Sequence, residues 1–260
     1  MKNYLLPAFA AILIVAGFAF WYRGYMPANS PAEQGTVPEN PIVIDPNATS
    51  TTVDGYTIER VQENVETSYP SLTRALPAST NGMSDEAHAK ILRSLSETVQ
   101  KLGKNPNDTE SWMILGTYRQ ILSDYEGAKE AWIFVAEKTQ FAQAYENLGN
   151  LYAGYLKDAV KAEANYKKAI ARDPIMPQYY RTLAEWYTNA SRAADAENTL
   201  RTGIKAVPKA LDLYVLLARQ LVANDKTKEA KALYAQAIES AKAQNNTDAV
   251  VQITAEMNKL

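Results

Sequence analysis

The chain has 260 residues, of which 47% are hydrophobic and 22% are charged, and its formal net charge is −2. This composition is ordinary for a globular protein. No basic stripe of the kind that binds a phosphate backbone is visible, so we expect no nucleic-acid partner. The sequence has no cysteine and a single histidine, His88. These counts exclude disulfides, thiol nucleophiles and multi-histidine metal sites, and we expect neither a metal nor another cofactor.

Residues 5–22 form an uncharged stretch, LLPAFAAILIVAGFAFWY. About 20 apolar residues span the ~30 Å hydrocarbon core of a bilayer, so this stretch predicts a transmembrane anchor within residues 1–23. Trp21 and Tyr22 stand at its end, where an interfacial aromatic belt would lie. A cleaved signal peptide is the alternative, although the best cleavage site, Ala28-Asn29-Ser30, would place Pro31 directly after the cut.

The charges around this stretch favour one orientation. Lys2 precedes it, and an acidic segment follows it. The positive-inside rule therefore favours a single-pass membrane protein with a cytoplasmic N-terminus and an extracytoplasmic body. In that arrangement the bilayer is itself a partner, through residues 5–22.

Residues 24–83 have the composition of an acidic, proline-rich linker. Five prolines fall between Pro27 and Pro46, and residues 24–82 carry seven acids against two bases. Such a segment buries too little apolar surface to fold, so we expect it to be largely disordered. Within it, Asp54-Gly55 suits a type I′ turn, and residues 51–58 could pair as a hairpin that docks elsewhere. An isolated hairpin is marginal at best, so the order of residues 51–62 stays open.

A helix is predicted over residues 84–104. Ser84 is a good N-cap, and two acids follow it in the first turn. Apolar residues then recur at spacings of three and four as far as Leu102, and Pro106 lies just beyond the end. His88 falls off the apolar stripe, which is typical of a surface residue.

Four alanines spaced 34 residues apart organise the rest of the chain: Ala128, Ala162, Ala196 and Ala230. A large apolar residue follows each of them by four positions: Trp132, Tyr166, Leu200 and Tyr234. A fixed period between 20 and 50 residues is the signature of a repeat array.

A second register precedes each alanine. It opens on an aromatic residue, at Trp112, Tyr145, Tyr180 and Tyr214, and four positions later it has a small one, at Gly116, Gly149, Ala184 and Ala218. Antiparallel helices approach closely only where the facing residues are small, and no such pair buries its apolar face alone. Residues 105–243 therefore predict about four stacked helix-turn-helix units. The second unit has one extra residue in its internal turn, near residues 156–158.

These residues resemble the tetratricopeptide repeat (TPR), whose pattern is W-x2-L-G, a tyrosine, A-x3-F, an alanine and a proline. The second unit carries Tyr145, Leu148, Gly149, Tyr152, Ala162, Tyr166, Ala169 and Pro174 at these places. The first unit departs from the pattern at Arg119, where the tyrosine belongs, and the fourth has Leu221 there. The resemblance implies an all-α, TPR-type solenoid behind the N-terminal transmembrane helix. Residues 244–260, with Thr247 as N-cap, predict a C-terminal capping helix.

The same resemblance implies that the first helices of the units line a concave groove that grips a peptide or a partner helix. By position, the groove residues would be Met113, Thr117, Glu146, Asn150, Arg181, Glu185, Val215 and Arg219. The alternative is that these eight are ordinary solvated residues. The known carboxylate clamp of the family is incomplete, since Met113 stands in place of its first lysine and Glu146 adds an acid.

The sequence favours a binding protein over an enzyme, because it has no phosphate loop, no strand–turn–nucleophile pattern and no paired acids in contrasting surroundings. We therefore expect a membrane-anchored adaptor that binds a protein or peptide partner in its groove. Two alternatives remain. The opening Asn105–Trp112 resembles TPR subunits of cytochrome c assembly, which hold an apocytochrome. An envelope scaffold that acts by homo-oligomerisation is the other.

Overall fold

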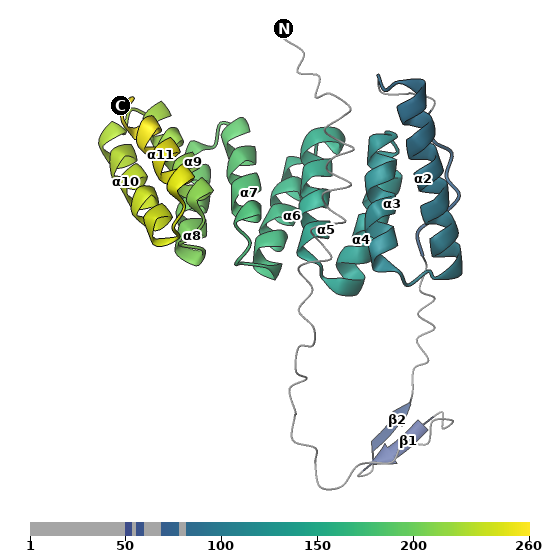
Figure 1. Cartoon of the computed structure of the whole chain (residues 1–260). Helices are drawn as coiled ribbons and strands as arrows, with labels where there is room; N and C mark the ends of the chain where they lie inside the picture. Colours follow the sequence, from purple (N-terminus) through teal and green to yellow (C-terminus); the bar gives the residue numbers. More distant parts are fainter. Residues whose placement is uncertain (1–49, 54–55, 60–68, 78–81) are drawn as a thin grey trace. The chain divides into compact units, whose positions relative to one another are not determined.

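The computed structural model of the chain describes residues 50–53, 56–59, 69–77 and 82–260 (Figure 1). The chain divides into two compact units, Met1–Ser68 and Tyr69–Leu260. In the first unit, β1 (Ser50–Val53) pairs antiparallel with β2 (Tyr56–Glu59), and Val53 lies opposite Tyr56. These are the strands of the hairpin that the sequence offered as an alternative.

The predicted anchor, residues 5–22, lies outside the described residues. Among the helices that are described, none is both long and apolar enough to cross a membrane.

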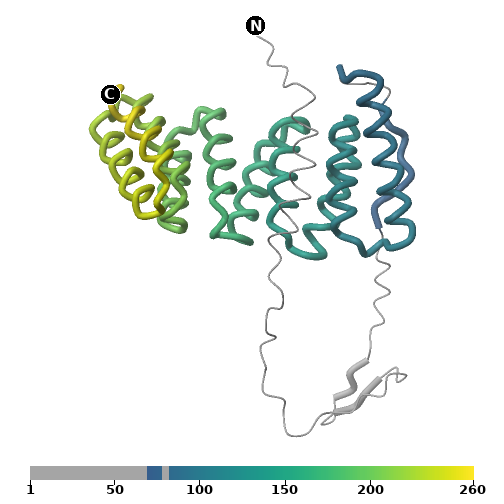
Figure 2. The backbone as a smooth tube through the Cα atoms, viewed as in Figure 1, coloured from purple at the N-terminus to yellow at the C-terminus, as the bar shows by residue number. Residues whose placement is uncertain are grey.

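The second unit is helical throughout its regular structure. Its elements are α2 (Asp85–Lys104), α3 (Thr109–Ile121), α4 (Tyr125–Thr139), α5 (Ala142–Leu151), the π-helical η1 (Tyr152–Leu156), α6 (Ala159–Arg172), α7 (Pro177–Asn189), α8 (Ala193–Ala206), α9 (Leu211–Ala223), α10 (Thr227–Ala243) and α11 (Thr247–Met257). Four pairs pack most extensively: α3 with α4, α5 with α6, α7 with α8, and α9 with α10. Figure 2 shows these pairs following one another along the unit.

The pairs form a solenoid with a continuous core. Each second helix (α4, α6, α8) also packs on the first helix of the next pair, while α2 covers α3 and α11 covers α10. One cluster of buried apolar residues runs from Leu102 to Ile253. Stacking of this kind is how a repeat array buries a core that no single pair could bury. The predicted helical solenoid is therefore confirmed for the second compact unit, Tyr69–Leu260.

The glycines of the first helices explain how closely the helices of a pair approach. A Cβ on Gly149 would lie 2.5 Å from Tyr166 Cδ1, and a Cβ on Gly116 would lie 2.4 Å from Trp132 Nε1. In the first two units, the aromatic ring that follows the repeat alanine therefore packs directly on the backbone of the glycine. This contact is the physical basis of the two registers seen in the sequence.

The extra residue of the second repeat unit is absorbed at the end of α5, the first helix of that repeat unit. Tyr152–Leu156 winds as a π-helix, and Asp158 N donates to Tyr152 O at 3.0 Å. A π turn holds more residues per turn than an α-helical one, and such turns occur mostly singly within α-helices. Beyond it, Lys157 takes a positive φ of 56°, as do Ser123, Ser191 and Asp225 at the same place in the other units. The insertion thus changes the helix and leaves the turn as it is in the other units.

The N-cap predicted for the first helix, α2, is confirmed, and the N-cap predicted for the last helix, α11, is not. Ser84 caps α2, because its side chain accepts a hydrogen bond from Ala87 N at 3.2 Å. The predicted cap of the last helix, Thr247, is its first helical residue instead. Asn246 is the N-cap, and its side chain accepts from Ala249 N at 3.0 Å. The asparagine satisfies the first-turn amide that Thr247 was expected to satisfy.

The predicted boundary of the linker also needs correction. We call Tyr69–Pro77 the strap, since this extended segment packs on the first unit of the array and belongs to the same compact unit. Arg119 Nη2 donates to Ser71 O at 2.6 Å, and Tyr69 Oη donates to Asn107 Oδ1 at 3.0 Å. The linker predicted over residues 24–83 therefore ends, as a separate segment, at residue 68.

Candidate partner-binding surface

The eight predicted groove residues fall on two rows along the first helices. We call Met113, Glu146, Arg181 and Val215 the lower row, and Thr117, Asn150, Glu185 and Arg219, which follow them by four positions, the upper row. The two rows differ in exposure and in the partners of their side chains, so they differ in what they can offer a ligand.

The lower row is largely engaged within the protein. Met113 is 4% exposed and belongs to the core. Arg181 Nη1 forms an ion pair with Asp212 Oδ2 of α9 at 3.3 Å. Val215 is half-buried and packs against the core. Arg181 thus connects neighbouring units, and burial leaves little of Met113 and Val215 for a partner.

Glu146 of the lower row is 2% exposed and joins α5 to α7. Its carboxylate accepts hydrogen bonds from Gln178 Nε2 and Thr182 Oγ1 of α7, and from Gln143 Nε2 of its own helix, each at 2.7 Å. Burial raises the pKa of the Glu146 carboxyl, and these three donors oppose the rise. The acid that the sequence placed in the groove therefore acts as a connection between the second and third units.

The upper row is more accessible. Asn150, Glu185 and Arg219 are exposed, and Thr117 is half-buried with its hydroxyl donating to Met113 O at 3.2 Å. Asn150 Oδ1 accepts from Tyr166 Oη at 2.8 Å, which leaves its amide nitrogen available to a ligand. Arg219 forms an ion pair with Glu256 of α11, the shorter contact being 2.6 Å.

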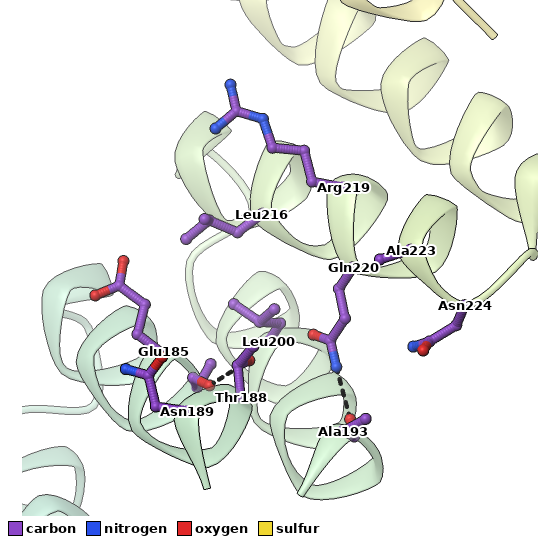
Figure 3. Close-up of a pocket in the computed structure, with 11 residues that line it drawn as sticks. Glu185, Thr188, Asn189, Ala193, Leu200, Leu216, Arg219, Gln220, Ala223 and Asn224 are labelled. Carbon is purple, nitrogen blue, oxygen red and sulfur yellow. Dashed lines mark hydrogen bonds between the residues drawn. The ribbon is translucent and has the colours of Figure 1, made fainter. Parts of the chain in front are cut away.

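Two members of the upper row, Glu185 and Arg219, line a hollow of about 570 Å³ between α7 and α9 (Figure 3). We call it the α7–α9 hollow; its lining is Ala184, Glu185, Thr188, Asn189, Ala193, Leu200, Leu216, Arg219, Gln220, Ala223 and Asn224. Figure 3 shows Leu200 between the α7 residues and the α9 residues. Leu200 takes the repeat position that is Tyr166 in the second repeat unit and Tyr234 in the fourth. Ala184 of α7 also lines the hollow.

Polar side chains surround this apolar base. Gln220 Nε2 donates to Ala193 O at 2.6 Å and so ties α9 to the start of α8. Among the described residues, the side chains of Glu185, Asn189 and Asn224 have no hydrogen-bond or ion-pair partner. An apolar base with a few unengaged polar groups at its edge is the usual composition of a ligand site.

Most of the residues that line the hollow were not identified from the sequence. Asn189 lies one helical turn after Glu185, and Ala223 lies one turn after Arg219. The signal that could have found them is this spacing of four, which extends the upper row along the same helical face. Leu200 was identified only as a core position.

The second helices carry a repeated ion pair between units. Arg192 Nη1 lies 2.5 Å from Glu163 Oε2, and Lys226 Nζ lies 3.2 Å from Glu197 Oε2, at positions 34 residues further on. Lys167 and Tyr187 also donate to Glu163. The hydrogen bond from Arg192 is the main reason that the pKa of the Glu163 carboxyl falls to about 2. The second helices therefore carry ion pairs between units as well as i,i+4 pairs within a helix, such as Lys167–Glu163.

No protein-family profile matches the sequence, and no curated protein matches it. The solved structures that resemble the chain include MamA, at 18% identity over 62% of this chain and 87% of that one, with a TM-score of 0.48. They also include the TPR protein TTC0263 of Thermus thermophilus, at 20% identity over 67% and 94% of the two chains, with a TM-score of 0.45. The type IV pilus biogenesis factor PilW matches at 18% identity over 66% and 86%, with a TM-score of 0.45. At this identity the similarity concerns the fold alone.

Proposed function

We propose that the protein is an adaptor, and that the α7–α9 hollow binds a segment of a partner protein. The observation that carries the proposal is the combination of an apolar base with three polar side chains that no other described residue engages. The solenoid holds this base and rim on two packed helix pairs, so the site is formed before a partner arrives. Preformed sites lose less entropy on binding than sites that must first become ordered.

The lining indicates the chemistry of the bound segment. An apolar side chain of the partner would pack against Leu200 and Leu216. The amides of Asn189 and Asn224 can each donate to and accept from a peptide backbone. A basic group would be placed beside Glu185, whose carboxylate lacks a cation among the described residues. Arg219 is paired with Glu256, so it is a weaker candidate for direct contact with an acid of the partner.

Site-specific photo-crosslinking in the native host tests this proposal. A photoreactive residue at Asn189 should capture a partner, and capture should fall at least tenfold in the double variant Glu185→Lys, Ala223→Glu. Both side chains are exposed, so the double variant should keep the helicity and melting temperature of the wild type. A photoreactive residue at Lys205, which is exposed on α8, is the matched control.

Two outcomes would reject the hollow as the binding site. One is equal capture from positions 189 and 205. The other is capture from position 189 that persists unchanged in the double variant while the array stays folded.

We also propose that residues 5–22 anchor the adaptor in a membrane, with the array on the extracytoplasmic side. This proposal rests on the apolar stretch and the charges beside it, and those residues lie outside the described part of the chain. A reporter that is active only outside the cytoplasm, fused after Leu260, should be active. An active cytoplasmic reporter at the same position would show the opposite orientation. Release of the protein from membranes by alkaline carbonate would rule out the anchor.

A further inference from the structure

The strap shows that this array can hold an extended segment along a second helix. From Ser71 to Pro77, exposed residues alternate with half-buried ones, as expected when one side of an extended segment faces a surface. The ring of Tyr69 lies 5.5 Å from that of Phe134, late in α4. Arg74 lies at the other end of α4, with Nε 3.2 Å from Asp124 and Nη1 2.9 Å from Glu130. The strap therefore runs antiparallel to α4.

The same place in the next unit is a hollow of about 320 Å³. We call it the α4–α6 hollow; its lining is Ile133, Ala136, Glu137, Tyr145, Leu148, Tyr152, Lys161, Ala164, Asn165 and Lys168. Three residues that contact the strap, Arg119, Glu130 and Phe134, correspond by repeat position to Tyr152, Ala164 and Lys168 in this lining. The hollow is thus the equivalent, one unit later, of the strap's binding surface.

The charges at the equivalent positions differ, although Asp158 keeps the acid of Asp124 and is paired by Lys161 at 3.0 Å. Glu130, which holds Arg74, is replaced by Ala164, and Lys161 lies one turn before it on the same face of α6. Lys161 Nζ lies 5.4 Å from the centre of the Tyr152 ring, and Lys168 Nζ lies 5.6 Å from that of Tyr145. The opposite wall contributes one acid, Glu137. An arginine that suits the first unit would meet a cation here.

We propose that the α4–α6 hollow binds an extended, acidic segment of a partner protein in the orientation of the strap. An aromatic residue of that segment lies against Lys168 and takes the place that Tyr69 has on Phe134. Apolar residues in its middle cover Tyr145, Leu148 and Tyr152. An acidic residue five positions after the aromatic residue pairs with Lys161.

The present partners of the two lysines do not prevent this binding. Lys161 pairs with Asp158 at 3.0 Å, and its side chain is 61% exposed. Exposed pairs of this kind contribute little free energy, so an acid of a ligand competes with Asp158 at small cost. A cation over an aromatic face can also contact a second ring, so Lys168 can keep Tyr145 while it receives the ring of the ligand.

Peptides with the strap sequence and opposite charges test the proposal with the full-length protein. The probes are labelled nonapeptides with the sequence of residues 69–77, one native and one with Arg74→Glu, and the measurement is fluorescence anisotropy at two salt concentrations. The Arg74→Glu peptide should bind at least fivefold more tightly than the native peptide. Its affinity should fall about tenfold in the protein variant Lys161→Glu, Lys168→Glu and should fall as salt is raised. The variant Lys205→Glu, with a charge change on α8, should bind like the wild type.

Three results would overturn the proposal. The first is equal affinity for the two peptides, and the second is binding that is indifferent to Lys161 and Lys168 in a variant of unchanged circular dichroism and melting temperature. The third is binding of the protein to vesicles of anionic lipid that needs both lysines, without any binding of the acidic peptide. That result would assign the lysines to a lipid surface.

Discussion

Arg119 Nη2 donates a hydrogen bond to the main-chain carbonyl of Ser71 at 2.6 Å, across 48 residues of sequence. Arg119 is 1% exposed, and its guanidinium also reaches Gly127 O at 3.4 Å and pairs with Asp124 at 3.7 Å. Burial lowers the pKa of this guanidinium, which the acids Asp124 and Glu130 oppose. Arg119, the cation that the first unit has in place of the repeat tyrosine, is therefore one of the residues that hold the strap.

Arg119→Leu should release the strap. Removal of one member of a buried charged network typically costs about 3–5 kcal/mol, and here the loss falls on the contact between the strap and α3. Trypsin should then cleave after Arg74 at least tenfold faster than in the wild type, because proteolysis follows the free energy of local opening. Arg93→Leu, at an exposed site on α2, is the control and should leave cleavage after Arg74 unchanged. Equal cleavage rates in wild type and Arg119→Leu would show that other contacts hold the strap.

Gly149→Ala should destabilise the array, because the new Cβ would lie 2.5 Å from the Tyr166 ring, which is packed in the core. Overpacking of this kind costs about 1–3 kcal/mol. Gly103→Ala is the matched control: it lies in α2 with no atom within 4 Å of the new Cβ. That change should stabilise by up to ~1 kcal/mol through helix propensity. Urea unfolding measures both, and the two changes should have opposite signs.

Lys157→Gly should stabilise the protein by roughly 0.5–1 kcal/mol. Lys157 has a φ of 56°, in the left-handed region, where a side chain costs energy and glycine does not. Part of that gain is lost because glycine makes the unfolded chain more flexible. Lys231→Gly, at an exposed position within α10, should instead destabilise by about 1 kcal/mol. Thermal unfolding of the two variants separates backbone geometry from loss of a lysine charge.

Glu163→Gln should make stability less dependent on acid pH. The folded-state pKa of Glu163 is about 2, against an ordinary value of 4.5. A depressed pKa stabilises the fold above pH 4.5, and this contribution is lost as the pH falls from 4.5 to about 2. Solvent screening at this partly exposed site limits the contribution to about 1 kcal/mol.

Urea unfolding should therefore show Glu163→Gln about 1 kcal/mol less stable than the wild type at pH 7, and nearly equal to it at pH 2. Glu239→Gln, at a side chain that is 73% exposed, is the control and should show a smaller difference at both values. A constant difference between wild type and Glu163→Gln over this range would assign the effect of the change to packing instead of charge.

The repeat architecture could be predicted because its cause is local and periodic. The repeat positions of Gly149 and Ala162 need small residues, because an aromatic ring or a neighbouring helix occupies the space beside them. This requirement returns with the same spacing in every repeat unit. The boundaries of the pairs followed from the same register. The extra residue was also visible, although its conversion into a π-helix was not, because several backbone solutions accommodate one insertion.

The candidate sites were predicted less well. The sequence placed eight residues on one surface, and the structure divides them into an engaged row and an accessible one. Glu146 and Glu185 look alike in the sequence, but two of the three donors around Glu146 come from α7, more than 30 residues away. Whether a polar side chain is free for a partner depends on such distant neighbours, and a single register does not contain that information.

The sequence by itself determined that this protein stacks helix pairs, because that property depends on the size of residues at fixed spacing. Only the tertiary structure decided which surfaces remain open. Arg119 departs from the repeat pattern in the sequence, and in the structure it binds the carbonyl of Ser71. Lys161 and Lys168 line the α4–α6 hollow, which no sequence pattern indicated. Both distinctions depend on contacts between segments far apart in the chain, and no local pattern records them.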